Sequence, residues 1–248
     1  QVKASMTCLM LILCMLLLLA PRDLAGACPT GCQCQDPKTI LCAARRGQTL
    51  WAVPPLDLPN LLLLDISWNK IPTIAPGAFH AVNIESLKIA GLGLTSLNEE
   101  LFQAQNNLHE LDVSDNLLER VPAVLRRLGS LTKLSLAGNA RISQLPAEDF
   151  HNLHNLQELD ISNLNINTIP RDFSSFFPRL RAMTAAGNPF NCICQMSWLV
   201  QWVNASKLGE NIYTWLFPIS SGKTLFFFFL VQVCVHLFCK ADQKGVFL

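Results

Sequence analysis

The chain has 248 residues, of which 50% are hydrophobic and 15% are charged, and its formal net charge is +1. So large an apolar fraction excludes a disordered chain, and so small a net charge leaves no basic footprint for nucleic acid. The 10 cysteines lie near the two ends, with none between Cys42 and Cys192, which indicates disulfide-bonded ends in an oxidising compartment.

The first 27 residues predict a cleaved signal peptide. Lys3 precedes the uncharged apolar run 6–20, Pro21 breaks that run, and Ala25-Gly26-Ala27 is a small-residue cleavage site before Cys28. A retained signal anchor is the alternative, but the run is shorter than the about 20 residues of a transmembrane helix. We therefore expect residues 1–27 to be removed as the chain enters the secretory pathway.

Residues 28–55 contain four closely spaced cysteines: Cys28, Cys32, Cys34 and Cys42. Four thiolates could hold a zinc ion or could form two disulfides, and a secreted chain favours disulfides. We expect this segment to be a cysteine cap that covers the end of the domain that follows.

Residues 56–187 contain about six copies of one pattern, each 23 to 25 residues from the next. The copies begin at Leu61, Ile84, Leu108, Leu131, Leu156 and Leu180. Positions one, four and six of each copy are apolar, and position nine is Asn69, Asn116, Asn139 or Asn188 in four copies but Leu92 or Leu164 in the other two. This is L-x-x-L-x-L-x-x-N, the leucine-rich repeat.

The pattern predicts an α/β repeat solenoid, a leucine-rich repeat horseshoe arc with a parallel sheet on its concave face. Positions four and six point inward from a short strand, and the position-nine amide bonds the backbone of the following turn. Later aromatic residues close the convex side: Phe79, Phe102, Phe150 and Phe173. A solenoid needs a cap at each end, since no repeat buries its own face.

The cysteine spacing of residues 28–42, and Asn188 to Cys194 (NPFNCIC), resemble the two cysteine caps of extracellular leucine-rich repeat proteins. This resemblance implies the pairs Cys28–Cys34 and Cys32–Cys42. Residues 188–207 are then a partial C-terminal cap, in which Cys192 and Cys194 lack clear partners. Within it, Asn204-Ala205-Ser206 predicts a glycan at Asn204.

Residues 208–248 form an atypical hydrophobic tail. Its apolar stretch, 224–239, would span about 24 Å as a helix, short of the about 30 Å of a bilayer core. We interpret the tail as sequence translated from a non-coding or alternatively spliced region, with a short membrane anchor or a buried cap helix as alternatives.

Positions three and five of each strand predict the concave surface, because alternate side chains point to opposite faces. The charged members are Asp65, Lys88, Glu110, Asp112, Lys133, Glu158 and Asp160. They could form two self-neutralising ladders, Asp65–Lys88–Asp112 and Glu110–Lys133–Glu158. They could also form a ligand face, whose surplus of three negative charges suits a basic patch. Glu148 and Asp149 are expected on the convex side, where charge reversal should affect binding little.

Several stretches, among them 87–94 (LKIAGLGL), 107–121 and 156–164, resemble a family of vertebrate type I membrane glycoproteins. The resemblance implies an extracellular protein that captures transforming growth factor beta and dampens its signalling. A matrix or cell-surface adhesion protein is the alternative. Members of the family have further repeats and modules, so we expect a shortened isoform or an incomplete gene model, whose product could lack function.

Catalytic signatures are missing from the sequence. The five histidines form no Ser-His-Asp arrangement or metal cluster with neighbouring residues. Ser220 to Thr224 ends in Gly-Lys-Thr but lacks the first glycine of a phosphate-binding loop. We therefore expect neither an enzyme nor a bound cofactor.

Overall fold

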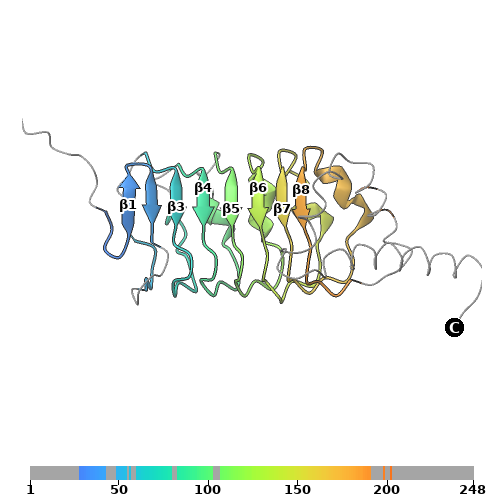
Figure 1. Cartoon of the computed structure of the whole chain (residues 1–248), viewed down its shortest axis with the longest axis horizontal. Coiled ribbons are helices and arrows are strands. Elements are labelled where there is room, and N and C mark those ends of the chain that lie inside the picture. Colours follow the sequence, from blue (N-terminus) through green and yellow to red (C-terminus); the bar gives the residue numbers. More distant parts are fainter. Residues whose placement is uncertain are drawn as a thin grey trace, which may run out of the picture.

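Figure 1 shows a solenoid in which short strands lie side by side along the length of the molecule. The computed structural model describes residues 28–42, 49–54, 56, 60–79, 83–102, 107–190, 198 and 202. Within these residues, one sheet contains eight strands in chain order. The strands are β1 (Gln33–Asp36), β2 (Thr39–Leu41), β3 (Leu63–Asp65), β4 (Ser86–Lys88), β5 (Glu110–Asp112), β6 (Lys133–Ser135), β7 (Glu158–Asp160) and β8 (Ala182–Thr184).

Strands β3 to β8 cover positions three to five of the six repeats. Neighbouring strands pair in parallel with no shift in register, so the position-four residues form one buried row. That row is Leu64, Leu87, Leu111, Leu134, Leu159 and Met183. A three-residue strand is stable here because each repeat stacks on its neighbours, and the predicted register is confirmed.

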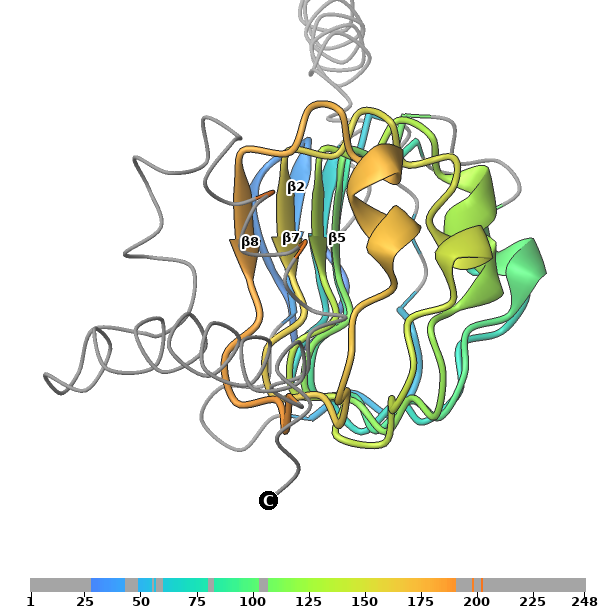
Figure 2. The ribbon, with the colours of Figure 1, turned by 90° about the vertical axis from the view of Figure 1, so that its right-hand side faces the viewer.

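Short helical turns cover the side opposite the sheet (Figure 2). They are the 3₁₀ helices η1 (Glu99–Phe102), η2 (Ala123–Arg127), η3 (Ala147–Asp149) and η4 (Arg171–Phe176). Phe79, Phe150 and Phe173 are each at most 1% exposed. The Phe150 ring meets Phe173 edge to face, with 5.1 Å between their centroids, a favoured aromatic geometry. The predicted aromatic closure of the convex side is confirmed.

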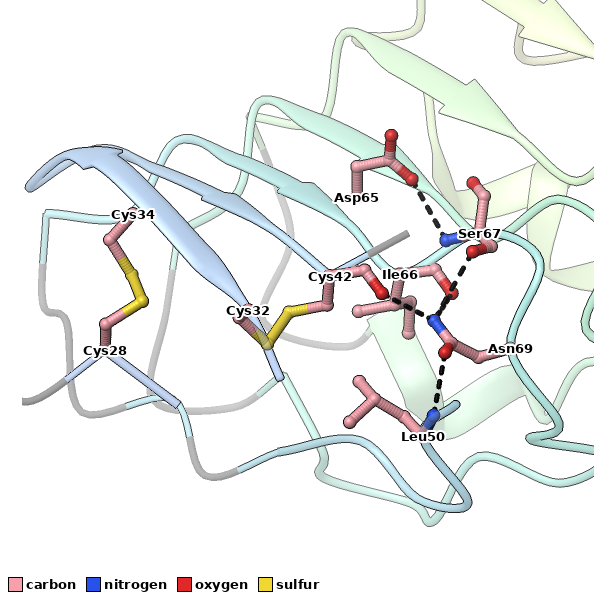
Figure 3. The surroundings of a disulfide bond; sticks show 9 residues. All are labelled: Cys28, Cys32, Cys34, Cys42, Leu50, Asp65, Ile66, Ser67 and Asn69. Carbon is pink, nitrogen blue, oxygen red and sulfur yellow. Dashed lines mark hydrogen bonds between the residues drawn. A yellow bond between two sulfur atoms is a disulfide. The ribbon is translucent and has the colours of Figure 1, made fainter. Parts of the chain in front are cut away.

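The N-terminal cap continues the sheet. Strand β1 pairs with β2 antiparallel, and β2 pairs with β3 in parallel. Disulfides join Cys28 to Cys34 and Cys32 to Cys42 (Figure 3), the same pairing that the resemblance to extracellular caps implies. Because Cys42 is 2% exposed and belongs to the main core, the second disulfide ties the cap to the first repeat.

Several predictions from the sequence concern residues that the structure does not describe. The signal peptide, Cys192, Cys194, Asn204 and the tail from residue 208 lie outside the described ranges. Near that end, Trp198 is 7% exposed, and its ring centroid lies 6.0 Å from that of Trp202. Across the described ranges, no helix combines the length and the apolar character needed to cross a bilayer.

Candidate ligand-binding face

The solvent side of β3 to β8, here called the concave face, carries an ion-pair network across four strands. Lys133 Nζ lies 3.2 Å from Glu158 Oε2 and 3.8 Å from Glu110 Oε1. Lys88 Nζ lies 3.9 Å from Glu110 Oε1. The hydrogen bond to Glu158 is the main cause of a raised Lys133 pKa, so this lysine stays charged throughout the neutral range.

Glu110 is the centre of this network. It accepts a hydrogen bond of 2.7 Å from Ser86 Oγ, in addition to its contacts with both lysines. The predicted ladder Glu110–Lys133–Glu158 is therefore present, and it extends diagonally to Lys88. Since two carboxylates face two lysines, the network is neutral as a whole.

The second predicted ladder, Asp65–Lys88–Asp112, is not formed by ion pairs among the described residues. Asp65 Oδ1 instead accepts a hydrogen bond from the backbone N–H of Ser67. Asp112 Oδ1 likewise accepts one from the backbone N–H of Ser114, and both bonds are 3.0 Å long. Asp160 Oδ1 accepts the N–H of Ser162 at 2.9 Å. The physical reason is length, because a short aspartate side chain reaches the turn that follows its own strand.

The three aspartates leave the concave face with uncompensated negative charge. Asp65, Asp112 and Asp160 are the position-five residues of their repeats and end β3, β5 and β7. Neighbours in this row are therefore two strands apart, or about 9.6 Å at the usual strand spacing. Each uses one oxygen for its turn, and each side chain is held in place by that bond. The arrangement is a row of fixed carboxylates beside a neutral network.

Most of this face, from β4 to β8, is hollowed. A cavity of about 420 Å³ is lined by residues of β4 to β8, including Lys88, Glu110, Asp112, Lys133 and Asp160. The structure thus brings all the predicted face residues onto one surface, with Asp65 on β3 beyond the edge of the hollow. Charged groups around a shallow cavity can bind a polar or charged partner surface.

Behind the concave face lies a buried row of asparagines that holds the turns together. Asn69 donates from Nδ2 to the carbonyls of Cys42 and Ile66, and its Oδ1 accepts the N–H of Leu50 (Figure 3). Asn116, Asn139 and Asn188 likewise bond the position-six carbonyls of their own and the preceding repeat. Each asparagine therefore spans two repeats.

This spanning explains why two repeats function without an asparagine. Leu92 and Leu164 occupy position nine in the second and fifth repeats and are buried. The position-six carbonyls of those repeats belong to Ile89 and Ile161. Each accepts a hydrogen bond from the asparagine of the following repeat, Asn116 and Asn188 respectively. From Cys42 to Ala185, each position-six carbonyl therefore accepts a hydrogen bond from at least one asparagine amide. The two leucines leave none of these carbonyls without a donor.

Position eight shows an alternation that sequence reasoning missed. Every repeat has a positive φ there, between 52° and 72°. The first, third and fifth repeats place Trp68, Asp115 and Asn163 at that position, and the others place Gly91, Gly138 and Gly187. A Cβ on each glycine would overlap the side chain before it: Trp68 on Gly91, Asp115 on Gly138 and Asn163 on Gly187. The repeats therefore interlock in pairs.

The signal for this pairing was visible in the sequence. Odd repeats read Asp-x-Ser at positions five to seven, and even repeats read Ala-Gly at positions seven and eight. Asp caps the odd turn, and glycine in the even repeat makes room for the preceding side chain. Within the described ranges, no group of three or more His, Cys, Asp or Glu residues could hold a metal ion, and His109 is exposed just before β5.

Comparison with known proteins identifies the repeats. The leucine rich repeat family model matches residues 82–140 and 131–190. Human vasorin is 56% identical over 157 residues, which are 63% of this chain and 23% of that protein. Mouse vasorin is 54% identical over 156 residues, and Xenopus tropicalis vasorin is 51% identical over 176 residues, or 69% of this chain and 26% of the relative. The chain spans about a quarter of the length of these curated relatives.

Proposed function

We propose that this chain, whose residues 82–190 match the leucine rich repeat family model and which is similar to vasorin, binds a protein ligand outside the cell through its concave face. The disulfide-bonded cap supports an oxidising, extracellular location. The predicted signal peptide and the sequon at Asn204 agree with secretion as a glycoprotein.

The observation that carries the proposal is the row of Asp65, Asp112 and Asp160. The ion-pair network beside them is neutral, so these three carboxylates set the net charge of the face. Fixed charges of one sign attract a complementary surface and orient it before contact. The ligand that fits this face is therefore a protein with a basic patch.

The specific ligand that we propose is transforming growth factor beta, and the consequence of capture would be weaker signalling. The support is the resemblance of the repeats to the vasorin family, with 51% to 56% identity. The matched segment is about a quarter of those relatives. The growth factor therefore has to be tested directly on this chain.

Surface plasmon resonance with the full secreted chain and active transforming growth factor beta tests this function. The triple variant Asp65→Asn, Asp112→Asn, Asp160→Asn keeps an oxygen that can accept the turn N–H, but removes three charges. We expect binding to weaken about ten-fold or more at low salt, and the difference to shrink at high salt, where surface charges are screened.

The matched control changes three exposed acids elsewhere: Glu100→Gln, Glu148→Gln and Asp172→Asn. It alters net charge equally and should leave binding nearly unchanged. Asp149 is unsuitable as a convex-side control, because it is buried and accepts hydrogen bonds from Arg126 Nε and Nη2 at 2.9 and 2.6 Å. Equal loss in both triple variants would refute the concave face as the binding site.

A further inference from the structure

Trp68 is held in a backbone conformation that its residue type disfavours. Its φ is 62°, in the left-handed region that a bulky side chain rarely adopts. The equivalent residues of the third and fifth repeats are Asp115 and Asn163, at 53° and 52°, and Asp and Asn tolerate this conformation. The turn itself therefore does not require tryptophan, and backbone strain of this kind concentrates at functional sites.

One side of the Trp68 indole lies against Gly91. The six-membered part of the ring occupies the space that a Cβ on Gly91 would fill. Trp68 is nevertheless 57% exposed, so the ring contacts the glycine while much of its surface stays open to solvent. The glycine of the second repeat thus makes a seat for an open aromatic platform.

The same edge of the solenoid already shows what such a platform can hold. Trp51 is 71% exposed, and Lys70 Nζ lies 5.1 Å from the centroid of its ring, within the range of a cation–π interaction. Lys70 is two residues from Trp68, and its backbone N–H bonds the carbonyl of Leu50, beside Trp51. A cation seated on an exposed indole is therefore compatible with this edge.

Charge also favours a cation at Trp68. Asp65, three residues earlier, ends β3 and belongs to the uncompensated aspartate row. Among the described residues, its second carboxylate oxygen, Oδ2, accepts no hydrogen bond, whereas Oδ1 caps the turn. A basic ligand attracted by the aspartates would place cationic side chains near the end of β3. Trp68 lies in the turn just after that end.

We propose that the open face of Trp68 receives a lysine or arginine side chain of the basic ligand, as a cation–π contact at the rim of the concave face. This inference rests on the proposed function, because the aspartate row supplies the attraction. It assigns Trp68 a role in specificity, since an arginine or lysine at one place in the ligand would be selected over an uncharged residue.

The test measures binding of octa-arginine peptide to the full chain by isothermal titration calorimetry at low salt. Trp68→Asn removes the ring and keeps a residue that the chain itself uses at this position in Asn163. A lost exposed cation–π contact should weaken binding about three-fold. Leu117→Asn is the control, because Leu117 is 44% exposed and is apolar without being aromatic.

We expect Leu117→Asn to bind as the unmodified chain does, with unchanged melting temperatures for both variants. Equal binding by Trp68→Asn, equal weakening in Leu117→Asn, or no binding of octa-arginine to the unmodified chain overturns the proposal. If octa-arginine binding depends on Trp68 while transforming growth factor beta does not bind, the growth-factor function fails and the platform stands.

Discussion

Two rows of polar side chains cross the solenoid in parallel, and they differ in burial. The asparagine row, Asn69, Asn116, Asn139 and Asn188, is at most 8% exposed. The lysines and glutamates of the concave network have side chains that are 27% to 54% exposed. A buried amide cannot exchange its partner for water, whereas an exposed ion pair can. The buried row therefore maintains the fold, and the exposed row is free to serve recognition.

The largest expected effect breaks the buried row. Asn116→Ala removes the acceptor of the Leu92 and Leu94 N–H groups and the donor to Ile89 and Val113. Among the described asparagines, only Asn116 reaches Ile89. Because each orphaned buried group costs about 1–3 kcal/mol, we expect about 3 kcal/mol of destabilisation, measured by urea denaturation.

Two further substitutions grade this effect. Asn139→Ala should cost less, about 2 kcal/mol, because Val113 keeps its bond from Asn116. Asn98 is exposed, and among the described residues its side chain bonds only the N–H of Glu100, in the first turn of η1, so Asn98→Ala should cost less than about 1 kcal/mol. Equal changes in all three variants would contradict the assigned repeat register.

A smaller effect is expected from the interlock between paired repeats. Gly138→Ala adds a Cβ that overlaps the Asp115 carboxylate, at a φ of 72°. Gly93→Ala is the matched control, because Gly93 has a φ of 83° but no atom within 4 Å of an added Cβ. Strain alone should cost about 1 kcal/mol at Gly93, and strain with overlap about 2 kcal/mol at Gly138.

The double variant Asp115→Gly, Gly138→Ala isolates the overlap. Removing the carboxylate should restore most of the difference from Gly93→Ala, which thermal melts of the four proteins would show. If the double variant is no more stable than Gly138→Ala, the pairing of repeats does not depend on this contact.

The fold could be predicted from the sequence because its controlling signal is local and repeated. Six copies with apolar residues at positions one, four and six fix which residue of each strand faces the core, and Leu64 to Met183 lie in that row. The identity of the face residues follows from the same register. The ion-pair partners of these residues cannot be predicted in the same way, because the register shows only which residues lie directly opposite each other on neighbouring strands.

Lys88 illustrates the limit. Register places it beside Asp65 and Asp112, yet its ion-pair partner is Glu110, two residues before Asp112 on β5. The longer glutamate reaches across the diagonal, and the aspartates bond their own turns. The interlock at position eight was missed for a similar reason, since it joins a side chain of one repeat to the backbone space of the next.

The smallest expected effect on stability tests the exposed row at its centre. Glu110→Gln removes the charge that contacts both Lys88 and Lys133, but keeps an oxygen for the Ser86 hydroxyl. Exposed ion pairs of this kind contribute about 0–1 kcal/mol, and Lys133 retains its closer partner Glu158 at 3.2 Å. We therefore expect urea denaturation to show a change below about 0.5 kcal/mol, far smaller than for Asn116→Ala. Binding of a basic ligand should weaken more clearly than stability does. The face loses one negative charge, and a lysine is left uncompensated against the basic ligand. A loss of stability as large as that of Asn139→Ala would show that the exposed row also maintains the fold, and the division between the two rows would fail.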